Sequence, residues 1–235
     1  MLALVEQLVK SGRAVAVLGN HEINLLRNEA KDGSGWFFEE RCERDQHRYA
    51  PFNRLDADVK VRTVSFLATL PIALEREDLR VVHAAWIGPH IDTARALPVT
   101  QMLKQYAHWD EQALAEAQAL EPLVRAELAA WPHALEDQAT EPPFLHAHAQ
   151  RESVRQMRNP LKVLTSGVER VGVEPFYSSG KWRFAERVQW WQEYDDETPV
   201  VVGHYWRRFQ AVDREAGKRR LSWPVDDNYL GRFVT

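Results

Sequence analysis

Three short segments of the chain share one pattern, in which an apolar run ends and a histidine follows at once or within three residues. In chain order, the apolar runs and the polar groups after them are 14–18 with Gly19-Asn20-His21-Glu22, 79–82 with His83, and 200–202 with Gly203-His204. A single histidine at the end of a strand is usually a hydrogen-bonded structural group. Three such ends in one sheet would meet at its carboxyl edge, where open α/β sheets build their sites. Neutral imidazoles and an amide oxygen suit a divalent cation, so the sequence predicts a metal site there.

The elements expected around these residues are those of an α/β fold. Leu4 and Leu8 recur at helical spacing, and Ser11-Gly12 supply a stop before the strand expected at 14–18. The other elements expected before residue 98 are a short helix near 23–26, a surface excursion over 28–53, a helix over 57–69, and a hairpin of 72–74 and 79–82. The second strand of this hairpin runs directly into His83.

The composition changes between residues 98 and 158, where Ala, Leu, Glu and Gln dominate and predict a helical insertion. A further helix is expected over 147–157. His146-Ala147-His148 has the alternating spacing of a metal pair on a strand, but it follows two prolines and enters this helical region, which favours a structural role. The strands expected afterwards are 162–165, 183–190, 199–202, 209–213 and 221–225.

Bulk properties predict one domain over residues 1–235 that contains this insertion. The 235 residues are 45% hydrophobic and 27% charged, and the formal net charge of −4 is too small to indicate a nucleic-acid partner. The chain has no basic leader and no apolar run long enough for a bilayer, so neither a signal peptide nor a membrane contact is expected. With Cys42 as its single cysteine, it cannot form an internal disulfide, and a cytoplasmic location is expected.

The histidine-bearing motifs resemble, in order, the later motifs of the calcineurin-like metallophosphoesterases. The motifs are Gly19-Asn20-His21-Glu22, Val82-His83-Ala84-Ala85-Trp86 and Gly203-His204-Tyr205-Trp206. The pattern is most similar to bacterial enzymes related to phosphoprotein phosphatases and to symmetrical diadenosine tetraphosphatases. This resemblance implies a sandwich of two mixed sheets flanked by helices. It also implies a dinuclear metal centre, from which a metal-bound hydroxide attacks a phosphomonoester or phosphoanhydride.

The resemblance also implies a role for each residue of the motifs. Asn20, His83 and His204 would bind the second metal, for which manganese is the first expectation and iron or zinc the others. His21 would contact the phosphate or protonate the leaving oxygen, while Glu22, with Gly19 beside it, would orient the loop without touching metal. The substrate would be a small phosphorylated compound or a phosphoprotein.

Arg187 is similar in position to a basic residue near the phosphate in related sequences, and its planar fork fits phosphate oxygens. The alternative is that Arg187 packs over the adjacent tryptophans.

The family's opening motifs have no counterpart here. Members begin with a strand carrying Asp-x-His, followed by Gly-Asp-x-x-Asp, and these supply the first metal site and the bridging carboxylate. Residues 1–19 contain no Asp and no His, and Glu6 is their only acid. The sequence therefore predicts a sandwich that lacks its first strands, from an internal start, a gene fragment or a decayed relative, and negligible turnover. The alternative function is a catalytically silent protein that binds a phosphorylated ligand.

Overall fold

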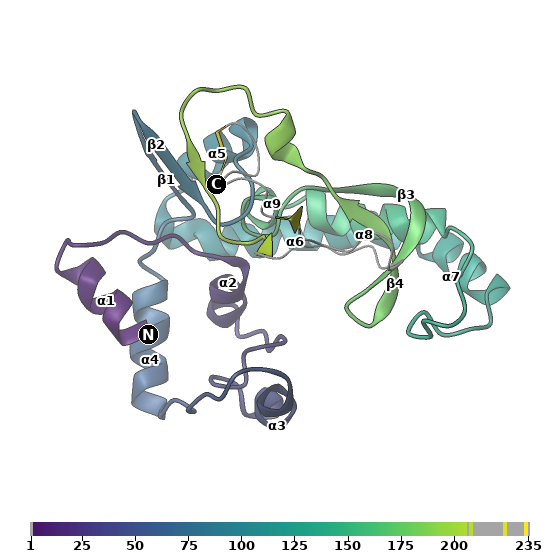
Figure 1. Cartoon of the computed structure of the whole chain (residues 1–235), viewed down its shortest axis with the longest axis horizontal. Coiled ribbons are helices and arrows are strands. Elements are labelled where there is room, and N and C mark those ends of the chain that lie inside the picture. The colour runs from purple at the N-terminus through teal and green to yellow at the C-terminus, as the bar shows by residue number, and fades with distance from the viewer. Residues whose placement is uncertain (1, 206, 209–222, 225–232, 235) are drawn as a thin grey trace.

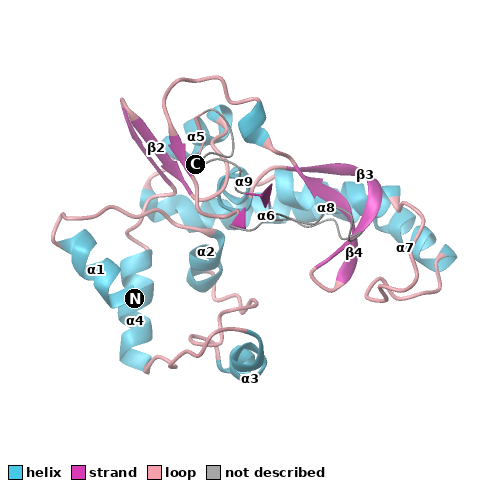
Figure 2. Cartoon of the chain, in the orientation of Figure 1, coloured by secondary structure: helices cyan, strands magenta, loops and turns pink. Residues whose placement is uncertain are grey.

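The computed structural model describes residues 2–205, 207–208, 223–224 and 233–234 of a mixed α/β chain (Figures 1 and 2). The α-helices of this part are α1 (Leu2–Lys10), α2 (Asn20–Leu26), α3 (Glu39–Arg48), α4 (Ala57–Leu67), α5 (Gly88–Arg95), α6 (Met102–Gln118), α7 (Glu121–Ala130), α8 (His146–Met157) and α9 (Pro160–Ser166). The strands are β1 (Ala73–Arg76), β2 (Leu79–Val82), β3 (Glu169–Ser178), β4 (Lys181–Arg187), β5 (Val200–Val201), β6 (Arg207–Arg208) and β7 (Trp223–Pro224). Short 3-10 helices span Val99–Gln101 and Trp190–Gln192.

The sheet that carries the histidines has the strand order β1-β2-β5. β1 and β2 form the predicted antiparallel hairpin, with Ala73 opposite Val82, and β5 lies parallel to β2, with Val81 opposite Val201. The sheet is therefore mixed. Because β2 and β5 are parallel neighbours, their carboxyl ends meet, as the sequence predicted for His83 and His204.

The strand predicted at 14–18 is wrong. This segment is irregular, and Val15 is 75% exposed. The Leu18 N–H donates to the Pro71 oxygen at 2.8 Å, just before β1, but none of the ladders in the described ranges includes the segment. An apolar run becomes a strand only when a neighbouring strand pairs with its backbone groups.

The strand predicted at 162–165 is also wrong, because this segment lies in α9. Pro160 occupies the first turn, and the Asn159 side chain accepts from the N–H groups of Leu161 and Lys162. Leu161, Val163, Leu164 and Thr165 are all buried. A run this short, with most of its side chains buried, lacks the periodicity that separates helix from strand.

The stretch between 98 and 158 is largely helical, as predicted, and α8 matches the helix expected at 147–157 within one residue. His146 and His148 lie on this helix, so their alternating spacing is not that of a strand pair. β4 ends at Arg187, earlier than the predicted Trp190. The strand expected at 209–213 lies outside the described residues, and of 221–225 only Trp223–Pro224 is described, as β7 parallel to β6.

Two clusters of buried side chains hold these elements. The larger one joins the β1-β2-β5 sheet to α2, α4, α5 and α9, with Leu18, Leu67, Val82, Leu161 and Val200 among its members. The smaller one consists of Leu145, Ala149, Trp182 and Phe184, and it fixes the β3-β4 hairpin on α8 (Figure 1). Each cluster therefore supports a different end of the molecule.

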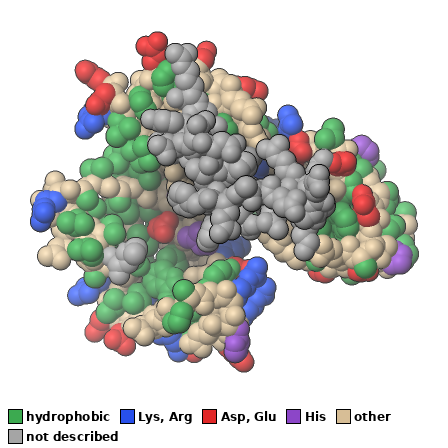
Figure 3. Space-filling view, viewed as in Figure 1, with side chains coloured by type: hydrophobic (Ala, Val, Ile, Leu, Met, Phe, Trp, Pro, Cys, Tyr) green, Lys and Arg blue, Asp and Glu red, His purple; other side chains and the backbone are tan. Residues whose placement is uncertain are grey.

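Figure 3 shows that hydrophobic side chains are exposed over the end formed by α1 and α4. Leu4 and Val61 are among the large apolar side chains that are exposed there. No helix in the described part of the chain combines the length and the apolar character that crossing a bilayer requires.

Candidate functional site

The loop before α2 brings the first group of candidate residues into place. Gly19 precedes the helix in an extended conformation (φ −101°), and its N–H donates to Glu22 Oε2 at 3.0 Å. A Cβ atom on Gly19 would lie 2.8 Å from Glu22 Oε2 and from the His83 ring. Glycine is therefore required for space, and Glu22 holds the loop, which is the orienting position that the resemblance implied.

His83 and His204 are fixed by backbone hydrogen bonds at the ends of β2 and β5. The N–H groups of Gly203 and His204 both donate to the His83 carbonyl, at 3.0 Å and 2.9 Å. This double contact holds residues that are 121 positions apart in the sequence. The two imidazole rings meet edge to face, with centroids 5.3 Å apart.

Asn20, His83 and His204 form one compact group, the histidine cluster. His83 Nε2 lies 3.1 Å from Asn20 Oδ1 and 3.4 Å from His204 Nδ1. The structure thus brings together the three residues for which the resemblance implied metal binding. Across the described ranges, no group of three or more His, Cys, Asp or Glu side chains is arranged around a possible ion. The histidine cluster contains two such side chains, and its third donor is the Asn20 amide oxygen.

Both imidazoles of the histidine cluster favour their neutral form. Burial lowers the pKa of His204 to about 3, and the positive charges of Arg187, His83 and His21 act in the same direction. Burial also lowers the pKa of His83, partly opposed by the negative charge of Glu22. A neutral imidazole has a free lone pair, which is the form that binds a metal ion.

His21 and Arg187 lie beside the histidine cluster without joining it. His21 is exposed in the first turn of α2, so its ring is free to meet a ligand or to exchange a proton. Arg187 ends β4 with its guanidinium carbon 6.0 Å from the centre of the Tyr205 ring. The predicted alternative was packing over the adjacent tryptophans, whereas the aromatic contact seen here is with Tyr205, the residue after His204.

One literal Asp-x-His sequence is present, at Asp45-Gln46-His47, but it lies in α3 and not in an opening strand. Asp45 is fully buried, accepts the Gly35 N–H at 2.8 Å and lies 3.5 Å from an Arg41 nitrogen. These contacts give Asp45 a structural role in the loop that precedes α3.

A further candidate site, which is concave, was not predicted from the sequence. It is a cavity of about 360 Å³, here called the arginine pocket, and the basic side chains that line it are Arg155, Lys162, Arg183 and Arg187. The signal that could have revealed it is the four-residue spacing of Arg183 and Arg187, which places both side chains on one face of a strand. Lys162 was hidden because its segment was assigned to a strand.

Comparison with protein-family models, with characterised proteins and with solved structures gives no match for this chain.

Proposed function

We propose that this chain is a metallophosphoesterase-type domain of the calcineurin-like kind, built on a sandwich of two mixed sheets. Its site would hold a divalent cation and a phosphomonoester or phosphoanhydride. The observation that carries the proposal is the convergence of three donor atoms, one each from Asn20, His83 and His204.

The spacing of these atoms fits a shared ion. Nitrogen and oxygen ligands lie about 2.0–2.2 Å from a divalent metal, so two ligands of one tetrahedral or octahedral ion are roughly 3.0–3.5 Å apart by simple geometry. The separations of 3.1 Å and 3.4 Å fall in this interval. Hydrogen bonds alone would also account for the shorter contact, so metal titration is the decisive measurement.

Each side chain has a distinct part in the proposed chemistry. Asn20, His83 and His204 would hold the cation, with manganese expected first and iron or zinc also compatible with these donors. A bound cation would acidify water and offset the charge that develops on a phosphoryl group. The exposed His21 would protonate the leaving oxygen, and the Arg187 guanidinium would orient phosphate oxygens through paired hydrogen bonds.

The second candidate is binding of a phosphorylated ligand without turnover. The observation that favours it is the neutral character of the histidine cluster, whose three donors carry no carboxylate, while the nearby Glu22 carboxylate accepts from Gly19. Three neutral donors bind a borderline dication less strongly than a set that includes an anionic donor. We therefore expect negligible hydrolysis of p-nitrophenyl phosphate by the 235-residue chain alone in manganese.

Calorimetric titration with Mn²⁺ tests the site. We expect one ion per chain, with a loss of affinity of at least tenfold in His83→Ala. The matched control is His90→Ala, because burial also lowers the pKa of His90, which lies on α5 outside the cluster. Equal effects of the two variants, or no binding at all, would contradict the metal site.

Activity assays separate the two candidate functions. Turnover of p-nitrophenyl phosphate that disappears in His21→Ala would reject the silent protein and support the esterase. Two tightly bound manganese ions per chain would show that anionic donors have been overlooked.

A further inference from the structure

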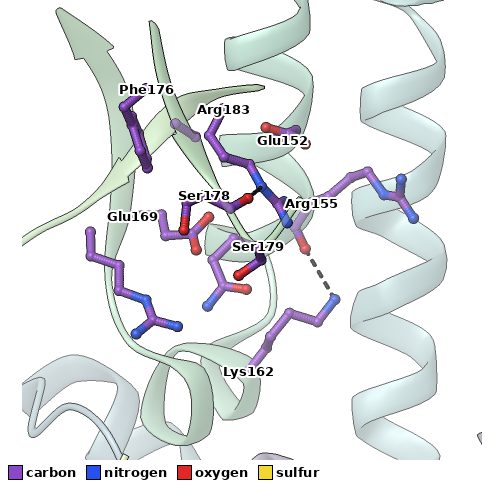
Figure 4. A pocket seen from close by; sticks show the side chains of 11 residues that line it. Glu152, Arg155, Lys162, Glu169, Phe176, Ser178, Ser179 and Arg183 are labelled. Carbon is purple, nitrogen blue, oxygen red and sulfur yellow. Dashed lines mark hydrogen bonds between the residues drawn. The ribbon is translucent and has the colours of Figure 1, made fainter. Parts of the chain in front are cut away.

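The arginine pocket lies between α8, α9 and the β3-β4 hairpin (Figure 4). In this close view, the side chains of Lys162, Glu169 and Arg183 are arranged around the hollow, Ser178 and Ser179 lie at its wall, and the Arg155 guanidinium extends away from it. Its volume of about 360 Å³ lies within the range of small-molecule sites. The feature is distinct from the histidine cluster, although Arg187 is a neighbour of both.

The alternation of β4 explains how the cations reach the pocket. Trp182 and Phe184 point to the buried face and pack in the smaller core, whereas Arg183, Ala185 and Arg187 point to the opposite face and line the pocket. The small Ala185 between the two arginines leaves room for a ligand. Arg155 on α8 borders the hollow with its backbone, whose carbonyl accepts from Lys162 Nζ at 3.1 Å, while its guanidinium extends outward (Figure 4).

The charges of the pocket are unevenly compensated. Among the described residues, no carboxylate lies within ion-pair distance of Arg155, Arg183 or Arg187. Lys162, in contrast, is paired with Asp110 at 2.6 Å. Glu152, an acid of the pocket, lies 3.7 Å from Lys181. Arg183 and Arg187 are therefore the guanidinium groups left to set the charge of the hollow.

Glu169 is the remaining acid, and it stands directly opposite Arg187 in the β3-β4 ladder. Burial raises its pKa, and the charge of Glu152 acts in the same direction, while Arg187, Arg183 and Lys162 oppose them. Glu169 thus gives up its negative charge more readily than an ordinary carboxylate, and in its neutral form it can donate a hydrogen bond.

We propose that the arginine pocket binds a compact oxyanion of the phosphate type, with more than one negative charge, carried by a small molecule. Guanidinium groups present paired N–H donors that match phosphate oxygens, and serine hydroxyls complete such a shell. The pocket draws its charged donors from α9 and the β3-β4 hairpin, so a ligand would be held from more than one side. This site needs no metal ion, and Arg187 is the side chain that it shares with the function proposed for the histidine cluster.

The test is calorimetric titration of the full chain with inorganic pyrophosphate in the presence of EDTA. We expect saturable binding of one pyrophosphate per chain. Arg183→Gln should weaken the affinity at least tenfold, whereas Arg155→Gln, whose exposed guanidinium extends away from the hollow, should change it less than twofold. Thermal melting checks that both variants fold.

The matched control is Arg170→Gln. Arg170 belongs to the same hairpin and carries the same charge, but it is 67% exposed and paired with Glu186 outside the pocket. We expect the affinity of the Arg170→Gln variant for pyrophosphate to stay within twofold of that of the parent chain. Equal losses in Arg170→Gln and Arg183→Gln would reduce the effect to general charge and overturn the proposal.

Two further outcomes would also overturn it. Binding that disappears in EDTA, or in His204→Ala, would assign the anion to the histidine cluster. A titration without saturation would show that these arginines are merely solvated. Parallel titrations with phosphate, sulfate and adenosine diphosphate distinguish a free inorganic ion from the phosphate group of a larger compound.

Discussion

The histidine cluster and the arginine pocket share Arg187 as a neighbour, yet they are built in opposite ways. The cluster consists of short, neutral side chains, two of them at strand ends and Asn20 at the start of α2, with donor atoms 3.1 Å and 3.4 Å apart. The pocket consists of long, charged side chains around a volume of about 360 Å³. The first arrangement is already close to the geometry of a small ion, whereas the second offers charge that can adapt to a larger one.

The difference extends to the supporting cores. The cluster lies on the β1-β2-β5 sheet and the larger hydrophobic core, while the pocket depends on a hairpin fixed by the smaller core. Stability at the two sites should therefore be separable, because local opening follows the number of buried contacts.

The largest effect is expected from Phe184→Ala, which strikes the smaller core. Phe184 is fully buried and packs edge to face against Phe144, with centroids 5.8 Å apart. Its truncation should cost about 3–5 kcal/mol. We expect a loss of pyrophosphate affinity of at least tenfold, with manganese affinity within threefold of the parent. Urea unfolding measures the loss of stability, and calorimetry measures the two affinities.

Phe66→Ala is the matched control for this separation. Phe66 is buried in the larger core, on α4, so its loss should lower the stability of the sheet end without singling out the pocket. Parallel loss of both ligands in both variants would show that the two regions unfold as one unit.

A smaller effect is expected from Gly19→Ala, which acts on the histidine cluster alone. The added methyl group would meet Glu22 Oε2 and the His83 ring at 2.8 Å, so these groups must shift. We expect manganese affinity to fall about tenfold, the lower end of the range for groups that orient metal ligands. Gly203→Ala is the control, because its nearest contact, His83 Nδ1, would be at 3.8 Å. A similar loss in both variants would show that crowding of His83 is not the cause.

The smallest effect is expected from Glu169→Gln in the arginine pocket. Because burial raises the pKa of Glu169 above its ordinary value of 4.5, the folded state is penalised as pH rises past the range where the unfolded carboxyl ionises. The amide variant should therefore melt up to about 2–4 °C higher near pH 8, the shift that about 1 kcal/mol gives at this size. Near pH 4 the Glu169 carboxyl is largely neutral in both the folded and the unfolded chain, so the difference in melting temperature between variant and parent should vanish.

Glu136→Gln is the control for this melting series, because Glu136 is exposed outside the pocket. It should change the melting temperature little at either pH. A larger gain in melting temperature of Glu169→Gln over the parent at pH 4 than at pH 8 would contradict the raised pKa of Glu169.

The sequence predicted the parts of the fold that depend on local pattern. The hairpin before His83, the helices around Ala57–Leu67 and His146–Met157, and the parallel approach of the segments before His83 and His204 are all present. The segment 14–18 could not be assigned from its residues, because a strand requires a partner that the pattern does not specify. The segment 162–165 was assigned to a strand for another reason: it is short and rich in β-branched and apolar residues, although the local Asn159-Pro160 signal marks the start of a helix.

The candidate site followed the same division. Asn20, His83 and His204 were predictable because each lies within a few residues of a recognisable apolar run. The arginine pocket was not, because Lys162 and Arg183 line one hollow only after a hairpin folds back on the helices. Chemistry at strand ends is visible in sequence, whereas chemistry between packed elements depends on tertiary structure.

The contact between His83 and His204 determines when the histidine cluster can be completed during synthesis of the chain. The second histidine lies 121 residues after the first, so at a ribosomal rate of about 5–20 residues per second it follows roughly 6 to 24 seconds later. Until then, only Asn20 and His83 of the three residues in the histidine cluster have been synthesised. An ion that needs all three donors could be bound only after His204 has been synthesised.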